Sequence, residues 1–513
     1  MKEKISVVVL FFVLLLLKLY FIGHNDVFFF FDQSRDAFVS RQIFEKGDLK
    51  LQGPSASGTN DTVYHGVLYY YVIGPIYTIF NGNPFYVDVT LAFLTTFNLV
   101  VFYLLVKKFS ASKVAAFIAS VMLAVSFDGI VTNTWLSNPI LTYSLLILFY
   151  YSLWRFVSER STFYFYLTAL FLGLANQSLI STIYLWGVTM VSIALVFWLD
   201  RRHQVKTLSL KKLFLFFTLY LFCVSTILLT QFKLARAGIF TLEALSKASS
   251  EKQASVFTCS VSTLLALSRK VNNSFFPQYY YASVLTFIAI LAIFIRKNSK
   301  KKILFVLLWL SSPFWLTLLH DRDSYHIFIG IEACIYLVTG VALSAFTRTK
   351  LGLLGVAIFL IIIILSQLQA IMHAKSEKTT QFWVERGALL SDELALIDKT
   401  YQLANGRQFT ISTATNPYLI NTTWSYLYDW YGKGKYNYLP LWYGNAQVDV
   451  PGAELLTKVE EPAELHFTIK EAEPGVQDWM KKELDQSFED RLGPAKENFY
   501  FGKLELSEFQ NTK

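Results

Sequence analysis

The sequence predicts a polytopic α-helical membrane protein with about eleven transmembrane helices, followed by a small extracytoplasmic α/β domain. Three observations predict this fold class. Hydrophobic residues make up 54% of the 513 residues and charged residues only 16%, whereas soluble domains carry about a quarter charged residues. Apolar segments of roughly membrane-spanning length recur as far as residue 372. Beyond that point Asp, Glu, Lys, Asn and Gly become common, and no apolar run is long enough to cross a bilayer.

The segments that we expect to cross the membrane are residues 5–22, 86–106, 113–127, 139–157, 162–177, 179–199, 212–230, 280–296, 303–319, 325–346 and 350–371. The first has the basic start of a signal peptide, but no small-x-small cleavage site follows it. We therefore interpret it as a retained first span. Residues 1–372 form the predicted transmembrane domain and residues 373–513 the predicted soluble domain.

Basic residues gather in one set of connections, which reads MKEK, KKFSASK, RFVSERS, DRRHQVKTLSLKK, RKNSKKK and TRTK. The positive-inside rule places these connections in the cytoplasm. The N-terminus is then cytoplasmic, and the C-terminal domain lies outside the plasma (inner) membrane. The net charge of +9 is explained by these clusters, so the composition indicates no nucleic-acid partner. Three widely spaced cysteines form neither a disulfide framework nor a metal motif.

The opposite connections are longer: residues 23–85, 128–139, 231–279 and 320–324. Six Lys and Arg side chains, among them Lys270, lie in residues 231–279, on the side where the rule disfavours them. Two interpretations stay open for this segment, an interfacial helix that binds anionic lipid head groups and a disordered loop. The predicted spans themselves contain almost no charged residues.

Short strands and one aromatic helix are predicted in the C-terminal domain. RQFTIST and ELHFTIK show period-two alternation, and ENFYFGKLELSEF is typical of a strand pair or one long strand. TTWSYLYDWYG predicts an aromatic helix that ends at Gly432. The domain contains no phosphate-binding Gly loop, no nucleophile elbow and no Cys/His cluster.

The stretch from Phe28 to Tyr71 carries the strongest functional signal. Four consecutive Phe residues end in Asp32, and the polar run that follows opens a helical pattern. Asp32 as a helix N-cap would be ordinary, but an ionisable group at the exit of a membrane span is a functional candidate. A partly desolvated carboxylate there is suited to general-base catalysis. We interpret Asp36 as a charge on the helix surface, and Tyr69, Tyr70 and Tyr71 as an interfacial aromatic belt in preference to a sugar platform.

This stretch resembles the GT-C membrane glycosyltransferases, specifically the family 39 group of protein O-mannosyltransferases and the lipid A aminoarabinose transferase. The matching residues are Asp32, Gln33 and Arg35, the turn Gly47-Asp48, and the motif His65-Gly66-Val67-Leu68-Tyr69-Tyr70. Two positions depart from the family pattern. Gly66 stands where the motif has Pro, and Asn138 stands where many members have a second Asp, for which Asp128 is the candidate replacement.

The resemblance implies a donor in which the sugar is linked to polyprenyl phosphate and is used at the outer leaflet. It implies a lipid, glycan or protein as the acceptor, and membrane lipids as further partners. It implies Asp32 as the general base of a transfer that inverts the anomeric centre. The candidates for the donor phosphate are Arg35, His65, His320, Arg322 and His326; the secondary candidates are Gln33, Asp128, Asn138 and Tyr69. No cofactor is implied with certainty, no metal ligands are assigned, and a divalent metal stays open.

Three alternatives remain at this point. The turn LLHDRDSYHIF, which carries His320, Arg322 and His326, is either a solvated connection or part of the site. A secondary transporter would place ionisable residues near the membrane midplane, whereas the polar residues here gather at one face. A catalytically inactive GT-C relative that serves as a scaffold is the third alternative, because of Gly66 and Asn138.

Overall fold

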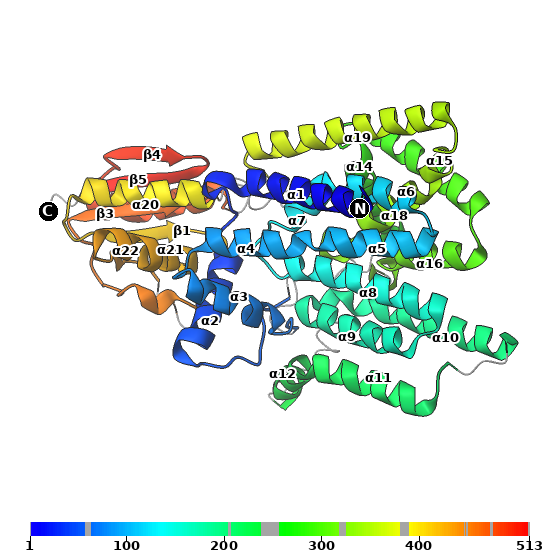
Figure 1. Ribbon diagram of the computed structural model, residues 1–513. Coiled ribbons are helices and arrows are strands. Elements are labelled where there is room, and N and C mark those ends of the chain that lie inside the picture. The colour runs from blue at the N-terminus through cyan, green and yellow to red at the C-terminus, as the bar shows by residue number, and fades with distance from the viewer. Residues whose placement is uncertain are drawn as a thin grey trace.

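The computed structural model describes residues 2–56, 63–203, 207–236, 256–317, 325–379, 389–445, 447, 450–471 and 476–510. A long helical bundle carries a compact α/β unit at one end (Figure 1). The polytopic helical fold with a small C-terminal α/β domain is therefore confirmed. Below, the end of the bundle that carries the α/β unit is called the domain end, and the opposite end the basic end.

The bundle follows the chain from α1 to α19. Its helices are α1 (Lys2–Ile22), α2 (Phe31–Lys46), α3 (Leu68–Ile79), α4 (Pro84–Thr96), α5 (Asn98–Ser110), α6 (Lys113–Ala124), α7 (Phe127–Thr132), α8 (Pro139–Glu159), α9 (Thr162–Ser178), α10 (Leu185–His203), α11 (Leu210–Cys223), α12 (Ser225–Arg236), α14 (Val256–Phe275), α15 (Tyr280–Lys297), α16 (Lys300–Ser311), α17 (Phe314–Thr317), α18 (Ile331–Ser344) and α19 (Lys350–Ser376). Short 3-10 turns are η1 (Gly23–Asn25), η2 (Ile180–Tyr184) and η3 (Tyr325–Phe328).

Seven helical segments of the described chain are long and apolar enough to cross a bilayer. They are Glu3–Asn25, Pro84–Ser110, Pro139–Glu159, Ile180–Asp200, Tyr280–Lys297, His326–Ser344 and Lys350–Ser376. The pair α11 and α12 passes the same test only when taken together, and it is bent by 67°. The three remaining predicted spans correspond to α6, α9 and α16, which have 12, 17 and 12 residues. The predicted count of about eleven is therefore not confirmed.

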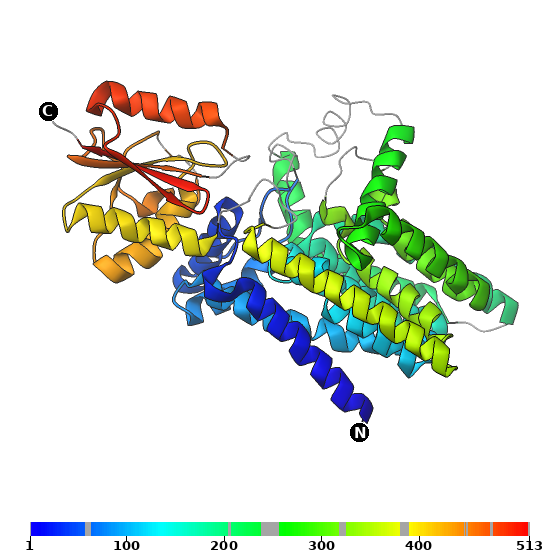
Figure 2. The same ribbon diagram turned by 90° about the horizontal axis from the view of Figure 1, so that it is seen from above.

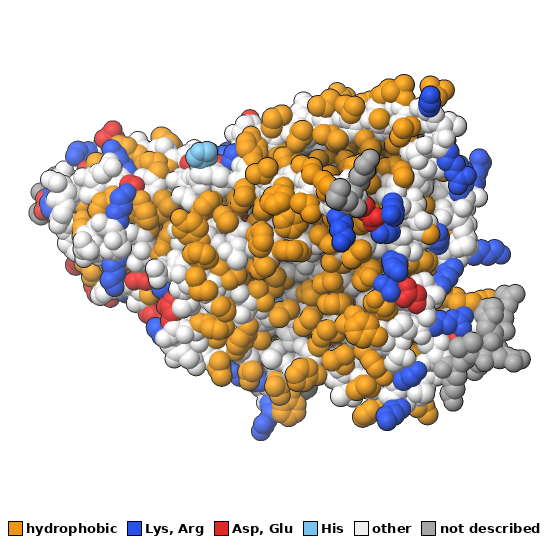
Figure 3. Space-filling model, in the orientation of Figure 1, with side chains coloured by type: hydrophobic (Ala, Val, Ile, Leu, Met, Phe, Trp, Pro, Cys, Tyr) orange, Lys and Arg blue, Asp and Glu red, His pale blue; other side chains and the backbone are white. Residues whose placement is uncertain are grey.

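The basic connections lie together at the basic end. Glu3 forms ion pairs with Lys107 and Lys113, which ties the N-terminus to the α5–α6 connection. Arg160 pairs with Asp200 at 2.6 Å, which joins the ends of α8 and α10. Figure 3 shows hydrophobic side chains over the visible flank of the bundle and Lys and Arg side chains along the basic end. This separation is the one expected of a protein whose flank contacts lipid.

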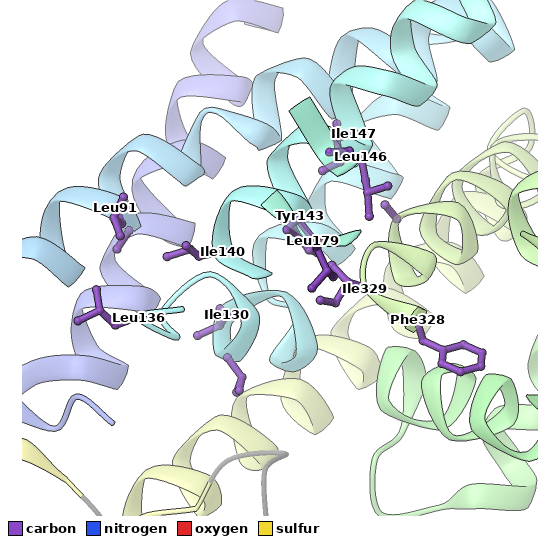
Figure 4. Close-up of a cluster of buried hydrophobic side chains, with 14 of the residues drawn as sticks. Leu91, Ile130, Leu136, Ile140, Tyr143, Leu146, Ile147, Leu179, Phe328 and Ile329 are labelled. Atoms are coloured by element: carbon purple, nitrogen blue, oxygen red, sulfur yellow. The ribbon is translucent and has the colours of Figure 1, made fainter. Parts of the chain in front are cut away.

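Toward the domain end, the bundle is packed by large apolar side chains from several helices. Figure 4 shows Leu91 of α4, Ile130 of α7, Ile140 and Tyr143 of α8, and Ile329 after η3 among them. Each of these five is at most 2% exposed. The connections that carry the candidate residues are anchored on this core.

The C-terminal unit is a five-stranded sheet in the order β2-β1-β3-β5-β4. Its elements are α20 (Leu390–Ala404), β1 (Thr410–Ala414), α21 (Thr422–Leu427), the π-turn η5 (Tyr428–Gly432), α22 (Lys433–Tyr436), β2 (Leu441–Trp442), η6 (Ala453–Leu455), β3 (Leu465–Lys470), α23 (Asp478–Leu492), β4 (Glu497–Phe501) and β5 (Leu504–Gln510). Strand β1 pairs in parallel with β2 and β3, with Ile411 opposite Trp442 and Phe467, and β5 runs antiparallel to β3 and β4. Helix α23 covers one face of the sheet, and α20 the other (Figure 2).

The predicted strands are confirmed, and the last segment forms a strand pair. Every residue of β1 and β3 is buried, because helices cover both faces of these central strands. The predicted end of the aromatic helix at Gly432 is wrong. The helical path continues through η5 and α22 to Tyr436 and ends at Asn437, which adopts the left-handed conformation with φ of 67°.

The α/β unit packs directly on the helix that carries Asp32. Residue Leu390 donates its backbone N–H to the Val27 carbonyl at 2.8 Å. On α2, the Ser34 hydroxyl lies 3.2 Å from that of Thr423 in α21. These contacts place α2 between the sheet domain and the membrane bundle.

Candidate functional site

Helix α2 begins immediately after the Phe run. Phe28, Phe29 and Phe30 are buried, and Phe30 is the N-cap, with its N–H donated to Gln33 Oε1 at 3.4 Å. Asp32 is therefore not the N-cap. It lies in the first turn of α2, where the positive end of the helix dipole favours a carboxylate.

Arg35 joins two carboxylates of the same helix. Its Nη1 donates to Asp32 Oδ1 at 2.6 Å. Its Nε and Nη2 donate to Asp36 Oδ1 at 2.9 and 2.8 Å. We call Asp32, Arg35 and Asp36 the α2 triad. The Asp32 side chain is 43% exposed and that of Asp36 only 2%, so the triad has one open and one closed end.

The interpretation of Asp36 as a helix-surface charge is wrong. Helix α3 packs on α2 and covers Asp36, so burial raises the pKa of its carboxyl from 3.8 to about 6. Arg35 acts in the opposite direction, and the Asp32 charge adds to the rise. The Tyr70 hydroxyl, which hydrogen bonds to Asp36, also lowers the pKa. Asp36 is thus a buried partner of Arg35.

His65 is held by the connection between α9 and η2. Its Nδ1 accepts the backbone N–H of Ile180 at 3.1 Å, which leaves the ring proton of a neutral His65 on Nε2. Burial lowers the pKa of His65 to about 3, and His326 and Arg35 contribute to the shift. His65 is therefore neutral at physiological pH and close enough to Arg35 to sense its charge.

Gly66, the departure from the family motif, has a local explanation. Its N–H donates to the Gln177 carbonyl at 2.9 Å, a bond that Pro cannot form. A Cβ atom at position 66 would lie 1.6 Å from Gln177 Oε1 and 2.7 Å from the Gln177 carbonyl oxygen. The close approach of this loop to α9 thus requires glycine.

His326 brings a distant segment to the same place. Its ring stacks on Trp135, with centroids 5.4 Å apart and planes 10° apart. It interacts electrostatically with Asp32, with Lys270 and with His65. The structure therefore brings together Asp32, Arg35, His65 and His326. His320 and Arg322 lie outside the described residues.

Asp128 is held in a buried ion pair. Lys270 Nζ donates to its Oδ2 at 2.9 Å, and Asn273 Nδ2 donates to its Oδ1 at the same distance. The Lys270 and Asp128 side chains are 6% and 0% exposed. We call Asp128 and Lys270 the buried pair. Both earlier interpretations of residues 231–279 are wrong for Lys270: residues 256–275 form α14, and Lys270 points into the bundle and not toward lipid.

The secondary candidates lie around these two clusters. Gln33 is buried, with Nε2 unpaired among the described residues. Asn138 precedes α8, and its carbonyl accepts the Ser178 hydroxyl at 2.9 Å, two residues before Ile180. Tyr69 and Tyr70 are 0% and 3% exposed, because α3 packs between α2 and α4. The interpretation of these tyrosines as an interfacial belt is therefore wrong for Tyr69 and Tyr70.

The few charged side chains inside the spanning helices are buried. Lys18 of α1 is 1% exposed and donates to Thr95 Oγ1 at 2.8 Å, and Asp88 of α4 and Glu332 of α18 are fully buried. Lys18 is four residues from the end of α1, Asp88 is four residues after the start of α4, and Glu332 is the second residue of α18. All three therefore lie near the domain end and not at the middle of a span.

The described residues do not fit a divalent metal. They contain no group of three or more His, Cys, Asp or Glu side chains placed to hold one. Asp32 and Asp128 are each paired with a cationic side chain, which opposes metal binding. We derive no step through a metal.

Sequence reasoning missed Lys270, Trp135 and the burial of Asp36. Lys270 carried a signal, since it is a basic residue on the side where basic residues are disfavoured; a buried acidic partner is one way to explain such an exception. Trp135 lies three residues before Asn138, the position that departs from the family pattern. The burial of Asp36 had no signal in the local pattern, because it depends on how α3 packs.

Comparison with known proteins identifies the fold. No family model and no curated protein sequence matches the chain. The crystal structure of ArnT from Cupriavidus metallidurans bound to undecaprenyl phosphate matches with a TM-score of 0.59 at 11% identity, covering 98% of this chain and 97% of that one. The apo structure of the same protein gives 0.56 at 10% identity, covering 99% and 98%. The chain therefore has the GT-C fold expected from the resemblance, including the C-terminal domain.

Proposed function

We propose that this protein is a membrane glycosyltransferase that moves a sugar from a polyprenyl-phosphate donor to an acceptor hydroxyl. One observation carries the proposal. At the domain end of a bundle with the GT-C fold, His326 interacts with Asp32 of the α2 triad, with His65 and with Lys270 of the buried pair, although these four residues come from four separate stretches of chain. A structural neighbour with the same fold was crystallised with undecaprenyl phosphate.

Asp32 is the proposed general base. It is the water-accessible carboxylate of the triad, with 43% of its side chain exposed, so an acceptor hydroxyl has access to it. Removal of the hydroxyl proton as the oxygen attacks the anomeric carbon is typically worth about 10²–10⁴ in rate. Attack from the side opposite the phosphate inverts the anomeric centre.

Arg35, His65 and His326 are the proposed partners of the donor phosphate, together with His320 and Arg322. Neutral histidines donate one N–H each, and a guanidinium binds phosphate oxygens with charge-assisted bonds. A lipid-linked donor brings its own leaving group, so the reaction needs no nucleotide.

We propose that the basic end faces the cytoplasm and that the domain end, with the site, lies at the outer face of the plasma membrane. The Lys and Arg side chains at the basic end support this orientation. Residues 373–513 then form an extracytoplasmic domain, which we propose selects a lipid, glycan or protein acceptor because it packs on α2. Exchange of this domain with that of a relative tests the assignment, and an unchanged acceptor preference would contradict it.

The test of the transferase is release of polyprenyl phosphate from sugar-loaded undecaprenyl-phosphate donors by the full-length protein in nanodiscs. Asp32→Asn should lower turnover at least a hundredfold. Glu45→Gln is the matched control, because Glu45 pairs with Arg41 on the same helix at 2.7 Å, outside the site. Unchanged turnover in Asp32→Asn would exclude Asp32 as the base. Absence of turnover with every donor and acceptor tried would favour the inactive scaffold or the transporter.

A further inference from the structure

Arg35 holds two carboxylates in different environments. Two of its N–H groups, on Nε and Nη2, are bound to Asp36, and the third bond runs from Nη1 to Asp32. Asp36 is closed off from water, whereas Asp32 is open to it. The guanidinium is therefore held by Asp36 on its buried side, whereas its hydrogen bond to Asp32 on the exposed side can be replaced by one to another acceptor.

The two attachments differ in how readily they break. Loss of the bonds to Asp36 would leave a buried carboxylate without its cation, which is strongly unfavourable. An ion pair at the water-exposed side contributes little, so Arg35 can leave Asp32 at low cost. The guanidinium carbon of Arg35 also lies over the ring of Phe31, 5.6 Å from its centroid, a contact that does not depend on Asp32.

We propose that Arg35 passes its Nη1 hydrogen bond from Asp32 to the departing lipid phosphate during sugar transfer, while Asp36 holds the rest of the guanidinium in place. This inference rests on the proposed function and deepens it. It makes Asp36 a positioning residue, and it makes Arg35 the link between the general base and the leaving group.

The acceptor O–H bond breaks and its proton passes to Asp32, while the acceptor oxygen bonds to the anomeric carbon. The bond from that carbon to the phosphate oxygen breaks, and its electron pair goes to the phosphate. Asp32 thus loses a negative charge in the step in which the phosphate gains one. The Arg35 Nη1–H group therefore stops donating to Asp32 and donates to a phosphate oxygen. The new bond is stronger in the transition state than with bound donor, which is the condition for rate acceleration.

The exchange is testable without sugar chemistry. Asp32→Asn mimics the neutral, protonated Asp32, so it should release Arg35 toward phosphate. We expect the full-length variant in nanodiscs to bind undecaprenyl phosphate about tenfold more tightly than wild type. In an Arg35→Gln background the same change should raise the affinity less than about twofold, because the transferred N–H is missing. Glu45→Gln, which also removes a carboxylate from an Arg pair on α2, should leave the affinity unchanged.

Asp36 gives the second arm of the test. Asp36→Asn added to Asp32→Asn should remove most of the tenfold gain, since Arg35 then lacks its anchor, and Asp36→Glu should restore part of it. An Asp32→Asn affinity equal to wild type, or a gain of the same size in the Arg35→Gln background, would overturn the exchange. A gain that depends on Arg35 in a protein with no turnover on any donor would uphold the movement of Arg35 from Asp32 to phosphate but reject its part in sugar transfer. Elution volume and melting temperature of each variant show that it is folded.

Discussion

The α2 triad and the buried pair are both carboxylate–cation clusters at the domain end, yet they are suited to opposite tasks. Asp32 is half open to water and shares its cation with a second acid. Asp128 is fully enclosed, and both of its oxygens are occupied by Lys270 and Asn273. The first arrangement tolerates a change of charge during a reaction, whereas the second stabilises one fixed pairing. The solvent exposure of a charged side chain therefore has to be known before a role in catalysis or in stability is assigned to it.

The largest effect expected from this contrast is on turnover. Asp32→Asn should lower kcat by about 10²–10⁴ while changing the melting temperature little, because an exposed ion pair contributes about 0–1 kcal/mol. Release of polyprenyl phosphate and a thermal melt of the same preparation check the two halves. If Asp32→Asn keeps full activity, or if it unfolds the protein, the triad has no catalytic role that distinguishes it from the buried pair.

The buried pair should show the reverse pattern in stability. Lys270→Met leaves the buried Asp128 carboxylate without its cation, and loss of one partner of a buried pair costs about 3–5 kcal/mol. Lys270→Met combined with Asp128→Leu should recover a large part of that loss. Denaturation of the single and double variants in matched detergent tests this. Equal stability of Lys270→Met and wild type would show that the pair is not a fixed structural unit.

Part of the candidate site was accessible from the sequence, whereas the contrast between the two clusters was not. Asp32 and Arg35 are one helical turn apart, and the resemblance to the family 39 group assigned them, with His65 and His326, to one site. The apolar runs and the strands of the C-terminal domain were also predicted. Asp128 and Lys270 are 142 residues apart, and no local period links them. Asp36 was misjudged because helical periodicity shows which residues share a face and not what covers that face.

A third test concerns the closed end of the triad. The pKa of Asp36 is raised from 3.8 to about 6 in the folded protein, so the folded state binds its proton more tightly than the unfolded state does. The protonated Asp36 carboxyl therefore contributes roughly 3 kcal/mol to the free energy of unfolding below about pH 4. This contribution is lost as the pH rises through about 6. Asp36→Asn should remove this component. The difference between wild-type and variant melting curves from pH 4 to 7 measures it.

The same titration should appear in activity, since Asp36 anchors Arg35 only when ionised. The charged and titratable groups that face it are Arg35 and Asp32 on α2 and, on α3, three tyrosines: Tyr69, Tyr70 and Tyr77. We expect wild-type turnover to rise with pH through about 6, and that limb should be absent from the residual activity of Asp36→Asn. An identical pH profile in the two proteins would show that Asp36 does not act through Arg35.

The smallest expected effect comes from a substitution beside His65 that should affect donor binding and not the buried pair. Gly66→Ala introduces a Cβ atom 1.6 Å from Gln177 Oε1 and 2.7 Å from the Gln177 carbonyl, and overpacking of this kind costs about 1–3 kcal/mol. The displaced loop carries His65, which lies beside Arg35, so donor affinity should fall while the buried pair is unaffected. Gln177→Ala should relieve the side-chain clash but not the clash with the carbonyl, and it also removes the bond from Nε2 to Thr226 at 2.7 Å. The double variant should therefore recover only part of the affinity. Full recovery of the affinity would mean that glycine is required only to make room for the Gln177 side chain. If the stability losses of Gly66→Ala and Lys270→Met do not add in the double variant, the two clusters are coupled through α9.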